Sequence, residues 1–183
     1  MINKSILLFG LMLIFGCIEK KPGVRNGVEL STYYRTVQID SILALSPIES
    51  SKHSLIRIYK IENMGAAQQP VNHMLEINFI ADAVQARYCK IDSAIKCEER
   101  NLNKSNCDSL VDYLETNNIP YLGTMQDGAS SVYDGAEHYV VKIMYKVFNQ
   151  YYFYDAEVNV KSRQHDFIVY LRKTMLPYFG KIF

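Results

Sequence analysis

This chain of 183 residues lacks a long apolar run. Its clearest apolar segment, residues 6–15, holds ten residues and no charge, whereas a transmembrane helix needs about 20. No later segment has the pattern of a membrane span. A short apolar core behind a basic residue, here Lys4, is typical of a secretory signal peptide. The sequence therefore predicts an exported protein rather than one that spans a membrane.

The chain also lacks an excess of charge of either sign. Its formal net charge is +1, and Lys4 is the only charged residue among the first 16, so 19 basic and 19 acidic residues follow. Because a nucleic-acid-binding domain needs a basic stripe, we expect no nucleic-acid partner. Tryptophan is absent, but there are 14 tyrosines. Tyrosine in strands mostly packs with its hydroxyl toward water, so this richness alone predicts no ligand site.

No motif that specifies a reaction or a metal occurs in the chain. The serines at 130 and 131 lie outside any G-x-S-x-G frame, and the histidines form no H-E-x-x-H pattern. The cysteines contain no closely spaced C-x₂₋₄-C pair of the kind that binds zinc. We therefore expect neither a metal nor a cofactor.

The end of the apolar run contains a recognisable processing motif. The residues Ile14, Phe15, Gly16 and Cys17 resemble the lipobox of bacterial lipoproteins. The resemblance implies cleavage between Gly16 and Cys17, a diacylglyceryl group on the Cys17 thiol and acylation of the new amino terminus. Because stable anchoring needs more than one acyl chain, these lipids would suffice to hold the protein on a membrane.

The same resemblance implies a location in the bacterial cell envelope. Residue 18 is isoleucine, not the aspartate that retains lipoproteins of enteric bacteria in the inner membrane, so the outer membrane is favoured. The polar residues that follow, with Pro22 and Gly23, are typical of a flexible tether. We thus expect a signal peptide over residues 1–16, a lipidated cysteine and tether over 17–27, and one globular domain over 28–183, a length suited to a single core.

Three further cysteines, Cys89, Cys97 and Cys107, follow the lipidated one. In an oxidising envelope compartment, three thiols predict one disulfide and one free cysteine. The interpretation favours Cys97 with Cys107, because Cys89 has the pattern of a buried strand residue. A pairing that involves Cys89 is the alternative.

Alternating apolar and polar residues predict several strands. They cover residues 55–60, 74–79 and 85–91, and a long hairpin covers residues 139–158 with a tight turn at Asn149 and Gln150. In the first hairpin strand the apolar residues share one face, and Lys142 and Lys146 are expected on a solvent-facing side that protects against strand pairing. Residues 28–46 are ambiguous between strand and helix, and residues 92–104 are expected to be irregular.

Two helices are predicted in the second half of the chain. Ser105 with Asp108 fits a capping box, and this helix should end at Asn117 and Asn118. Ser162 should cap a last helix that Pro177 ends or kinks. Strands in adjacent runs with helices set apart predict an α+β fold, an antiparallel sheet packed on one face by two helices. This globular part resembles small exported bacterial proteins of uncharacterised type.

One segment gathers residues that could carry chemistry. Asp134, Glu137 and His138 lie within five residues of turn-rich chain, and loops often hold general acids and bases. They are candidates for an envelope hydrolase that acts on a cell-wall or glycan substrate. The structural interpretation is stronger, because such residues also stabilise turns and open strands.

These observations favour a non-catalytic function. The expected anchor, the modest size, the balanced charge and the lack of a catalytic frame predict an envelope lipoprotein that binds another protein. It would act as an accessory of an envelope or secretion complex, or as an immunity factor against a toxin. The hydrolase is the alternative, and binding of a small ligand by a tyrosine-lined sheet face is a weaker one.

Overall fold

The computed structural model describes residues 27–62, 71–80, 83–124, 137–155 and 162–183. Within these ranges the chain forms a six-stranded antiparallel sheet with the spatial order β4-β3-β2-β1-β5-β6. The predicted α+β class and the long C-terminal hairpin are confirmed. The strands are β1 (Ser54–Glu62), β2 (Asn72–Ile80), β3 (Ala83–Ile91), β4 (Ile95–Leu102), β5 (Glu137–Tyr145) and β6 (Val147–Asp155).

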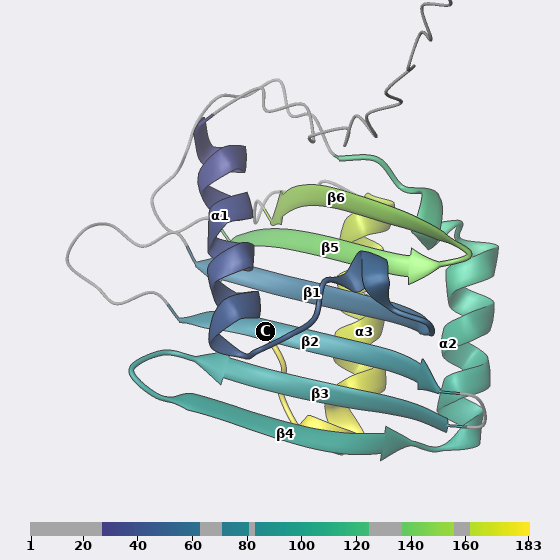
Figure 1. The fold of residues 1–183 in the computed structure, drawn as a ribbon. Coiled ribbons are helices and arrows are strands. Elements are labelled where there is room, and N and C mark those ends of the chain that lie inside the picture. Colours follow the sequence, from purple (N-terminus) through teal and green to yellow (C-terminus); the bar gives the residue numbers. More distant parts are fainter. Residues whose placement is uncertain (1–26, 63–70, 81–82, 125–136, 156–161) are drawn as a thin grey trace, which may run out of the picture.

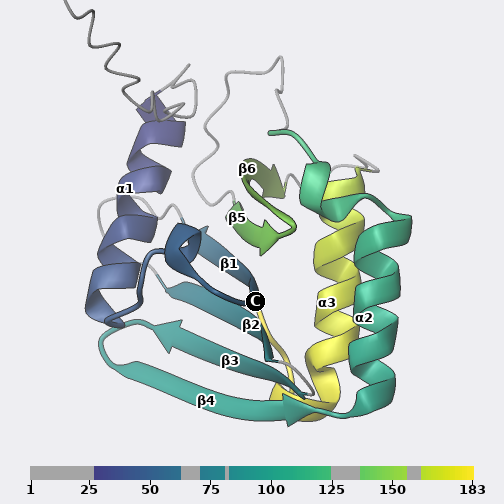
Figure 2. The same cartoon turned by 45° about the vertical axis from the view of Figure 1, so that its right-hand side comes forward.

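Helices cover both faces of this sheet (Figure 1, Figure 2). On one face lie the two predicted helices, α2 (Lys104–Thr116) and α3 (Arg163–Phe179), and on the other lies α1 (Gly27–Ile42). Two short 3₁₀ helices, η1 (Ile48–Ser50) and η2 (Ile119–Tyr121), complete the described elements. The expectation that helices pack on one face alone is therefore wrong, because the segment left ambiguous forms α1.

The larger core lies between the sheet and the helices α2 and α3. Alternate residues of each central strand point to this side, as the period of two requires, and they meet the buried stripes of the two helices. The strand residues include Ile56, Ile58, Leu75, Ile77, Tyr139, Val141, Ile143, Tyr151 and Phe153, and the helix residues include Leu110, Leu114, Phe167, Leu171 and Met175.

A smaller core lies beneath α1. Thr32, Thr36 and Ile39 of the helix and Leu43, directly after it, are buried, and their spacing of three or four residues places them on one side. Only two of these four are large apolar residues, which explains why the sequence pattern did not distinguish a helix from a strand. Ile39 and Leu43 pack on strand residues that include Tyr59, Met74 and Val140.

A buried charge network joins α1 to the sheet. The Asp40 carboxylate of α1 accepts a hydrogen bond from Lys142 Nζ at 2.9 Å and from the Tyr59 hydroxyl, and it lies 3.5 Å from an Arg57 nitrogen. Arg57 also donates to Glu76 over 2.6 Å. Arg57 and Lys142 are only 3% and 6% exposed. The expectation that Lys142 lies on a solvent-facing side is therefore wrong, because α1 covers this face.

The hairpin reverses direction earlier than expected. Tyr145 pairs directly with Val147, and Lys146 between them has a positive φ of 62°. Asn149 and Gln150 therefore lie inside β6 and not in a turn. Asn149 instead points toward η2, where its side chain donates to the carbonyl oxygens of Pro120 and Leu122 over 2.9 Å each.

The strand β4 was not predicted, because its sequence has almost no apolar alternation. Seven of its eight residues are exposed, and charges such as Glu98, Glu99 and Arg100 occupy both of its faces. It lies at one edge of the sheet and is held by its ladder with β3. Charged edge strands of this kind resist pairing with other chains.

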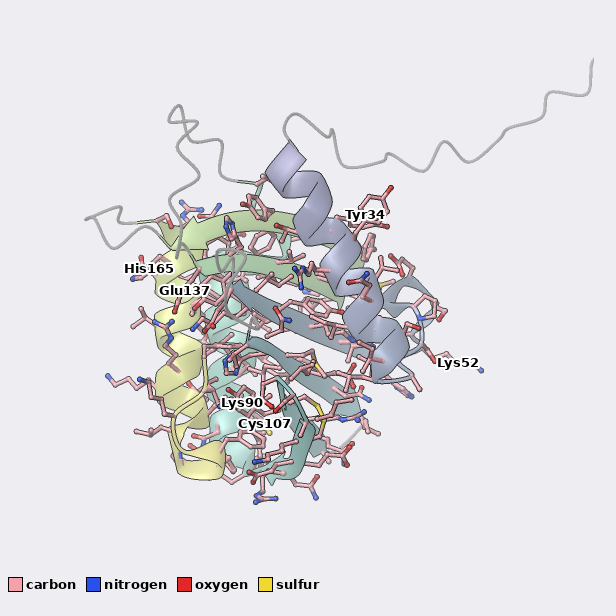
Figure 3. All side chains as sticks on the ribbon, turned by 90° about the vertical axis from the view of Figure 1, so that its left-hand side faces the viewer. Tyr34, Lys52, Lys90, Cys107, Glu137 and His165 are labelled. Carbon is pink, nitrogen blue, oxygen red and sulfur yellow. A yellow bond between two sulfur atoms is a disulfide. The ribbon has the colours of Figure 1, made fainter. Side chains whose placement is uncertain are left out.

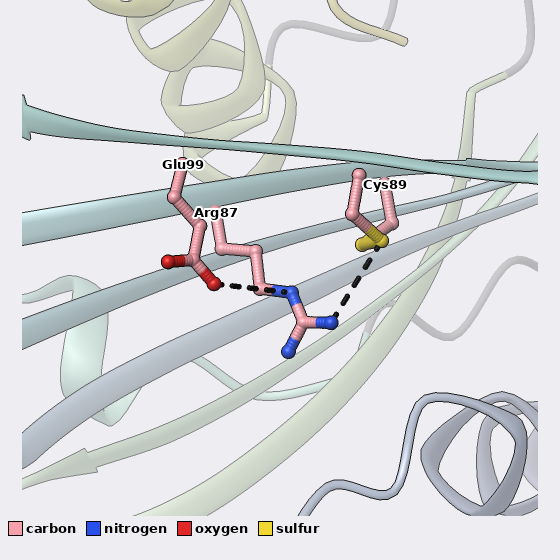
Figure 4. Close-up of a disulfide and its surroundings, with 4 residues drawn as sticks. Arg87, Cys89 and Glu99 are labelled. Atoms are coloured by element: carbon pink, nitrogen blue, oxygen red, sulfur yellow. Dashed lines mark hydrogen bonds and ion pairs between the residues drawn. A yellow bond between two sulfur atoms is a disulfide. The ribbon is translucent and has the colours of Figure 1, made fainter.

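The disulfide joins Cys89 of β3 to Cys97 of β4, which are directly opposite in the ladder (Figure 4). The favoured pairing of Cys97 with Cys107 is wrong, and Cys107 is a free thiol on α2. The reason is geometric. Cys89 and Cys97 point toward the α1 face, where Cys89 is part of the smaller core, whereas Cys107 packs against the larger core on the opposite face.

The helix ends follow the predicted chemistry with two changes. The Ser162 side chain caps α3 by accepting from the His165 amide, as expected, and α2 ends at Thr116 with Asn117 as its C-cap. Asn103 rather than Ser105 caps the start of α2. Pro177 lies inside α3, which continues to Phe179, so it does not end the helix.

Removing the Asp40 charge tests the network beneath α1. We expect Asp40→Asn to lower the free energy of unfolding by about 3 kcal/mol, because it leaves buried cations without their shared carboxylate. Urea unfolding followed by circular dichroism measures the change. The matched control is Glu98→Gln, which removes an exposed carboxylate paired with Arg100 at 2.7 Å and should cost less than about 1 kcal/mol. Equal losses in both variants would contradict this assignment.

Candidate functional site

The predicted catalytic residues do not form one site. Glu137 and His138 are the first two residues of β5, and successive side chains of a strand point to opposite faces of the sheet. Glu137 therefore lies on the α3 side (Figure 3), and His138 lies on the α1 side. Asp134, the third candidate, lies outside the described residues.

Glu137 belongs to a cluster of polar side chains between the sheet and α3. Its carboxylate lies 2.5 Å from Lys60 Nζ on the neighbouring strand β1. It also accepts a hydrogen bond from the Tyr139 hydroxyl over 3.0 Å. Arg172 of α3 donates to the same hydroxyl over 2.7 Å and lies 3.7 Å from the carboxylate. The carboxylate is thus held by groups from three elements.

This environment keeps Glu137 ionised. Partial burial alone would raise the pKa of its carboxyl group, but the hydrogen bond and positive charge of Lys60 outweigh burial, with further help from Tyr139 and Arg172. The pKa is therefore lower than usual. The general acid of a glycoside hydrolase needs the opposite, a raised pKa, so Glu137 does not suit that role.

His138 lies in a separate environment, on the α1 side of the sheet. Its Nδ1 atom is 2.6 Å from the Tyr152 hydroxyl, and the two rings stack with their centroids 5.9 Å apart. Burial lowers the pKa of His138, so the imidazole is neutral at pH 7. The sheet lies between this ring and Glu137.

His73 is brought next to the Glu137 cluster by the sheet register. It pairs with Lys60 across β1 and β2, and its Nδ1 atom lies 2.6 Å from the Tyr88 hydroxyl. That hydroxyl accepts the amide of Phe183 over 3.2 Å, which leaves its own proton for His73. Nδ1 is then an acceptor, as in a neutral imidazole. Burial, followed by the positive charge of Lys60, lowers the pKa of His73 to about 4.

Part of the cluster is packed interior, while Glu137 and Arg172 are 35% and 33% exposed. Lys60, Tyr139 and His73 are all buried. The Phe183 ring lies edge-on to both His73 and Tyr139, with centroid distances of 6.5 and 5.8 Å. The Phe183 ring therefore packs over His73 and Tyr139, whereas Glu137 and Arg172 keep contact with solvent. The contacts within this cluster are ion pairs, hydrogen bonds and ring packing.

Sequence reasoning missed Lys60, His73 and Arg172, which surround Glu137. Strand alternation places Lys60 and His73 on the apolar faces of their strands. This pattern is the signal in the sequence that could have predicted their burial. Their meeting with Arg172 depends on sheet register and on the position of α3, which the local pattern does not contain. Across the described part of the chain, no group of three histidine, cysteine, aspartate or glutamate side chains could hold a metal ion.

Two exposed apolar surfaces remain on the outside of the molecule. The first, here called the hairpin-tip patch, gathers the exposed residues Tyr121, Val147 and Phe148 at the end of the β5–β6 hairpin. Strand alternation directs Phe148 to the α1 side of the sheet and Val147 to the α2 side, where Tyr121 lies. The hydrogen bonds of Asn149 to η2 fix Tyr121 beside the β5–β6 turn. Lys146 and Glu115, paired at 2.9 Å, lie at its edge. An apolar centre with a charged edge is the usual composition of a protein-binding surface.

The second surface, here called the outer face of α1, consists of Tyr33, Tyr34 and Val37. These residues are exposed, and Figure 3 shows Tyr34 on the side of α1 turned away from the sheet. The helical period places Tyr34 and Val37, together with the exposed Gln38 and Ser41, on the side opposite the buried residues, and Tyr33 at the edge of that side.

Comparisons of the chain with models of protein families and with curated proteins find no match. None of the helices in the described ranges combines the length and apolarity that a membrane span requires.

The lowered pKa of His73 predicts acid sensitivity. In the unfolded chain this imidazole takes up a proton near pH 6.5, but in the folded protein it does so only near pH 4. The stability that the neutral ring contributes is complete above pH 6.5 and is lost as the pH falls toward 4. Between pH 7 and pH 4.5, we expect the free energy of unfolding of the wild type to fall by about 2 kcal/mol more than that of His73→Gln.

Urea unfolding of the two proteins at both pH values measures this difference. An NMR titration of the histidine ring protons in the folded wild type gives the pKa of His73 directly. An identical fall in stability for wild type and variant would contradict the assignment.

Proposed function

We propose that the chain is a lipid-anchored protein of the bacterial cell envelope that acts as a non-catalytic protein-binding module. It would serve as an accessory of an envelope or secretion complex, or as an immunity factor that neutralises a toxin. Cys17 carries the anchor, and a polar tether links it to the α+β domain.

The placement of Glu137 and His138 is the observation that carries the non-catalytic part of the proposal. The two side chains lie on opposite faces of the sheet. Each is engaged by neighbouring groups, Glu137 by Lys60 at 2.5 Å and His138 by Tyr152 at 2.6 Å. A general acid and a general base must both reach one substrate. These two residues are not arranged to do so, and no observation favours the hydrolase.

The anchor is supported by the order of features in the first 17 residues. Lys4 precedes an uncharged apolar run over residues 6–15, and Gly16 and Cys17 follow it. The run is too short for a membrane helix and has the length of a signal-peptide core. The Cys89–Cys97 disulfide is also typical of an oxidising compartment outside the cytoplasm.

The binding activity is supported by the hairpin-tip patch. Phe148 is 41% exposed and Tyr121 is 61% exposed, and aromatic residues supply much of the binding free energy at protein interfaces. The patch is held firmly, because β6 is bonded to β5 along its length and to η2 through Asn149. A rigid apolar surface binds with little loss of conformational entropy.

Mass spectrometry of the native protein tests the anchor. We expect a polypeptide that begins at Cys17 and carries three acyl chains, because the lipobox directs both processing and acylation. Cys17→Ser should remove the acylation. The matched control is Cys107→Ser, which replaces the free thiol on α2 and should leave the acylation intact. A native polypeptide that keeps Met1, or an unmodified Cys17, would contradict the proposal.

Site-specific photo-crosslinking in intact cells tests the binding surface. A photoreactive amino acid at position 148 should give one major adduct with another envelope protein, whereas the same group at Val169, an exposed apolar residue of α3, should not. Phe148→Ser should weaken recovery of that protein from solubilised membranes by about tenfold or more, the effect of removing an aromatic anchor. Equal labelling from both positions, or no adduct under several growth conditions, would overturn this assignment.

A further inference from the structure

The outer face of α1 has an unusual composition for a helix that already buries its other side. Tyr33, Tyr34 and Val37 are 37%, 59% and 45% exposed, and with the exposed polar residues Gln38 and Ser41 they make up an amphipathic side of α1 directed away from the sheet. The inner side of the same helix is fixed by Ile39, Leu43 and the ion pairs of Asp40. The exposed residues are therefore not needed to hold α1 in place.

The position of this helix in the chain places the surface near the proposed anchor. Gly27, the first residue of α1, follows Cys17 by ten residues. A segment of that length reaches at most about 35 Å when fully extended. Tyr33 and Tyr34 lie only two helical turns further along. They are the first large exposed side chains among the residues whose side chains the structure describes, which begin at Thr32.

The chemistry of this surface suits the interface between lipid and water. Tyrosine side chains concentrate at the headgroup level of membranes, because their rings are apolar and their hydroxyls are polar. The tether adds Lys20, Lys21 and Arg25 against a single acid, Glu19. Each such basic residue is attracted to anionic lipid headgroups. The aromatic residues on α1 and the basic residues beside the anchor thus both favour contact with the headgroups of a lipid bilayer.

We propose that the outer face of α1 lies against the headgroup region of the bilayer that holds the acylated Cys17. This inference rests on the proposed anchor. In this arrangement α1 is the membrane-facing side of the domain. The helices α2 and α3, on the opposite face of the sheet (Figure 2), are directed away from the lipid.

A single tryptophan probe tests the proposal, because the natural chain contains no tryptophan. Full-length, lipid-modified protein with Tyr34→Trp is reconstituted into vesicles of phosphatidylethanolamine and phosphatidylglycerol, with and without brominated acyl chains. The matched control is Tyr121→Trp, which replaces an equally exposed tyrosine of η2. We expect a blue-shifted emission from position 34 and about twofold or more quenching by the brominated lipids, whereas position 121 should show neither.

The possible outcomes separate this proposal from the anchor itself, because the mass of the same preparation reports acylation of Cys17. Acylated protein in which the probe at position 34 emits as in water would overturn the membrane contact and leave the anchor standing. A blue shift without quenching would overturn it too, since another protein copy would then cover α1. An unacylated Cys17 would remove the anchor and, with it, this proposal. Weaker quenching in vesicles of phosphatidylcholine alone would support the contribution of the basic tether.

Discussion

Coverage of both faces of the sheet is the constraint on which the rest of this structure depends. Helices cover both faces of β1 and β5, so charged side chains of these strands that point inward are kept from water. Each of them therefore needs a partner of opposite charge. The Asp40 carboxylate meets this need on one face, where it is shared by Lys142 and by Arg57. On the other face, Glu137 does the same for Lys60. The ion pairs of Asp40 join α1 to β1 and β5, and the ion pair of Glu137 joins β5 to β1. These pairs help to fix the positions of α1 and β5.

Much of the architecture could be predicted from local pattern. Alternation identified β1, β2, β3 and β5, and the capping residue Ser162 identified the start of α3. The pattern failed where local sequence does not determine the structure. The edge strand β4 exists because β3 offers it a ladder and a disulfide partner, although five of its eight residues are charged or polar. The burial of Lys142 depends on α1, which is more than a hundred residues away along the chain.

The candidate site illustrates a limit of another kind. Closeness in sequence suggested that Glu137 and His138 could act together, yet adjacency in a strand places two side chains on opposite faces. The hairpin was predicted over residues 139–158, whereas β5 begins at Glu137, so both candidates lie within the strand. The true neighbours of Glu137 are Lys60 on β1 and Arg172 on α3. They are distant in sequence, and only the sheet register and the packing of α3 bring them near.

The charge network beneath α1 also has a mechanical consequence for a protein held by lipid at one end. A tether of ten residues leaves a domain free to rotate, but a helix bonded to the sheet transmits any contact it makes to the whole sheet. Asp40 makes its bonds to β1 and β5, and β5 continues directly into the β5–β6 turn that carries the hairpin-tip patch. If α1 lies on the bilayer, the same connections therefore set the orientation of Phe148 relative to the membrane. An anchored binding module gains from such coupling, because a surface held in one orientation loses less rotational freedom when its partner binds.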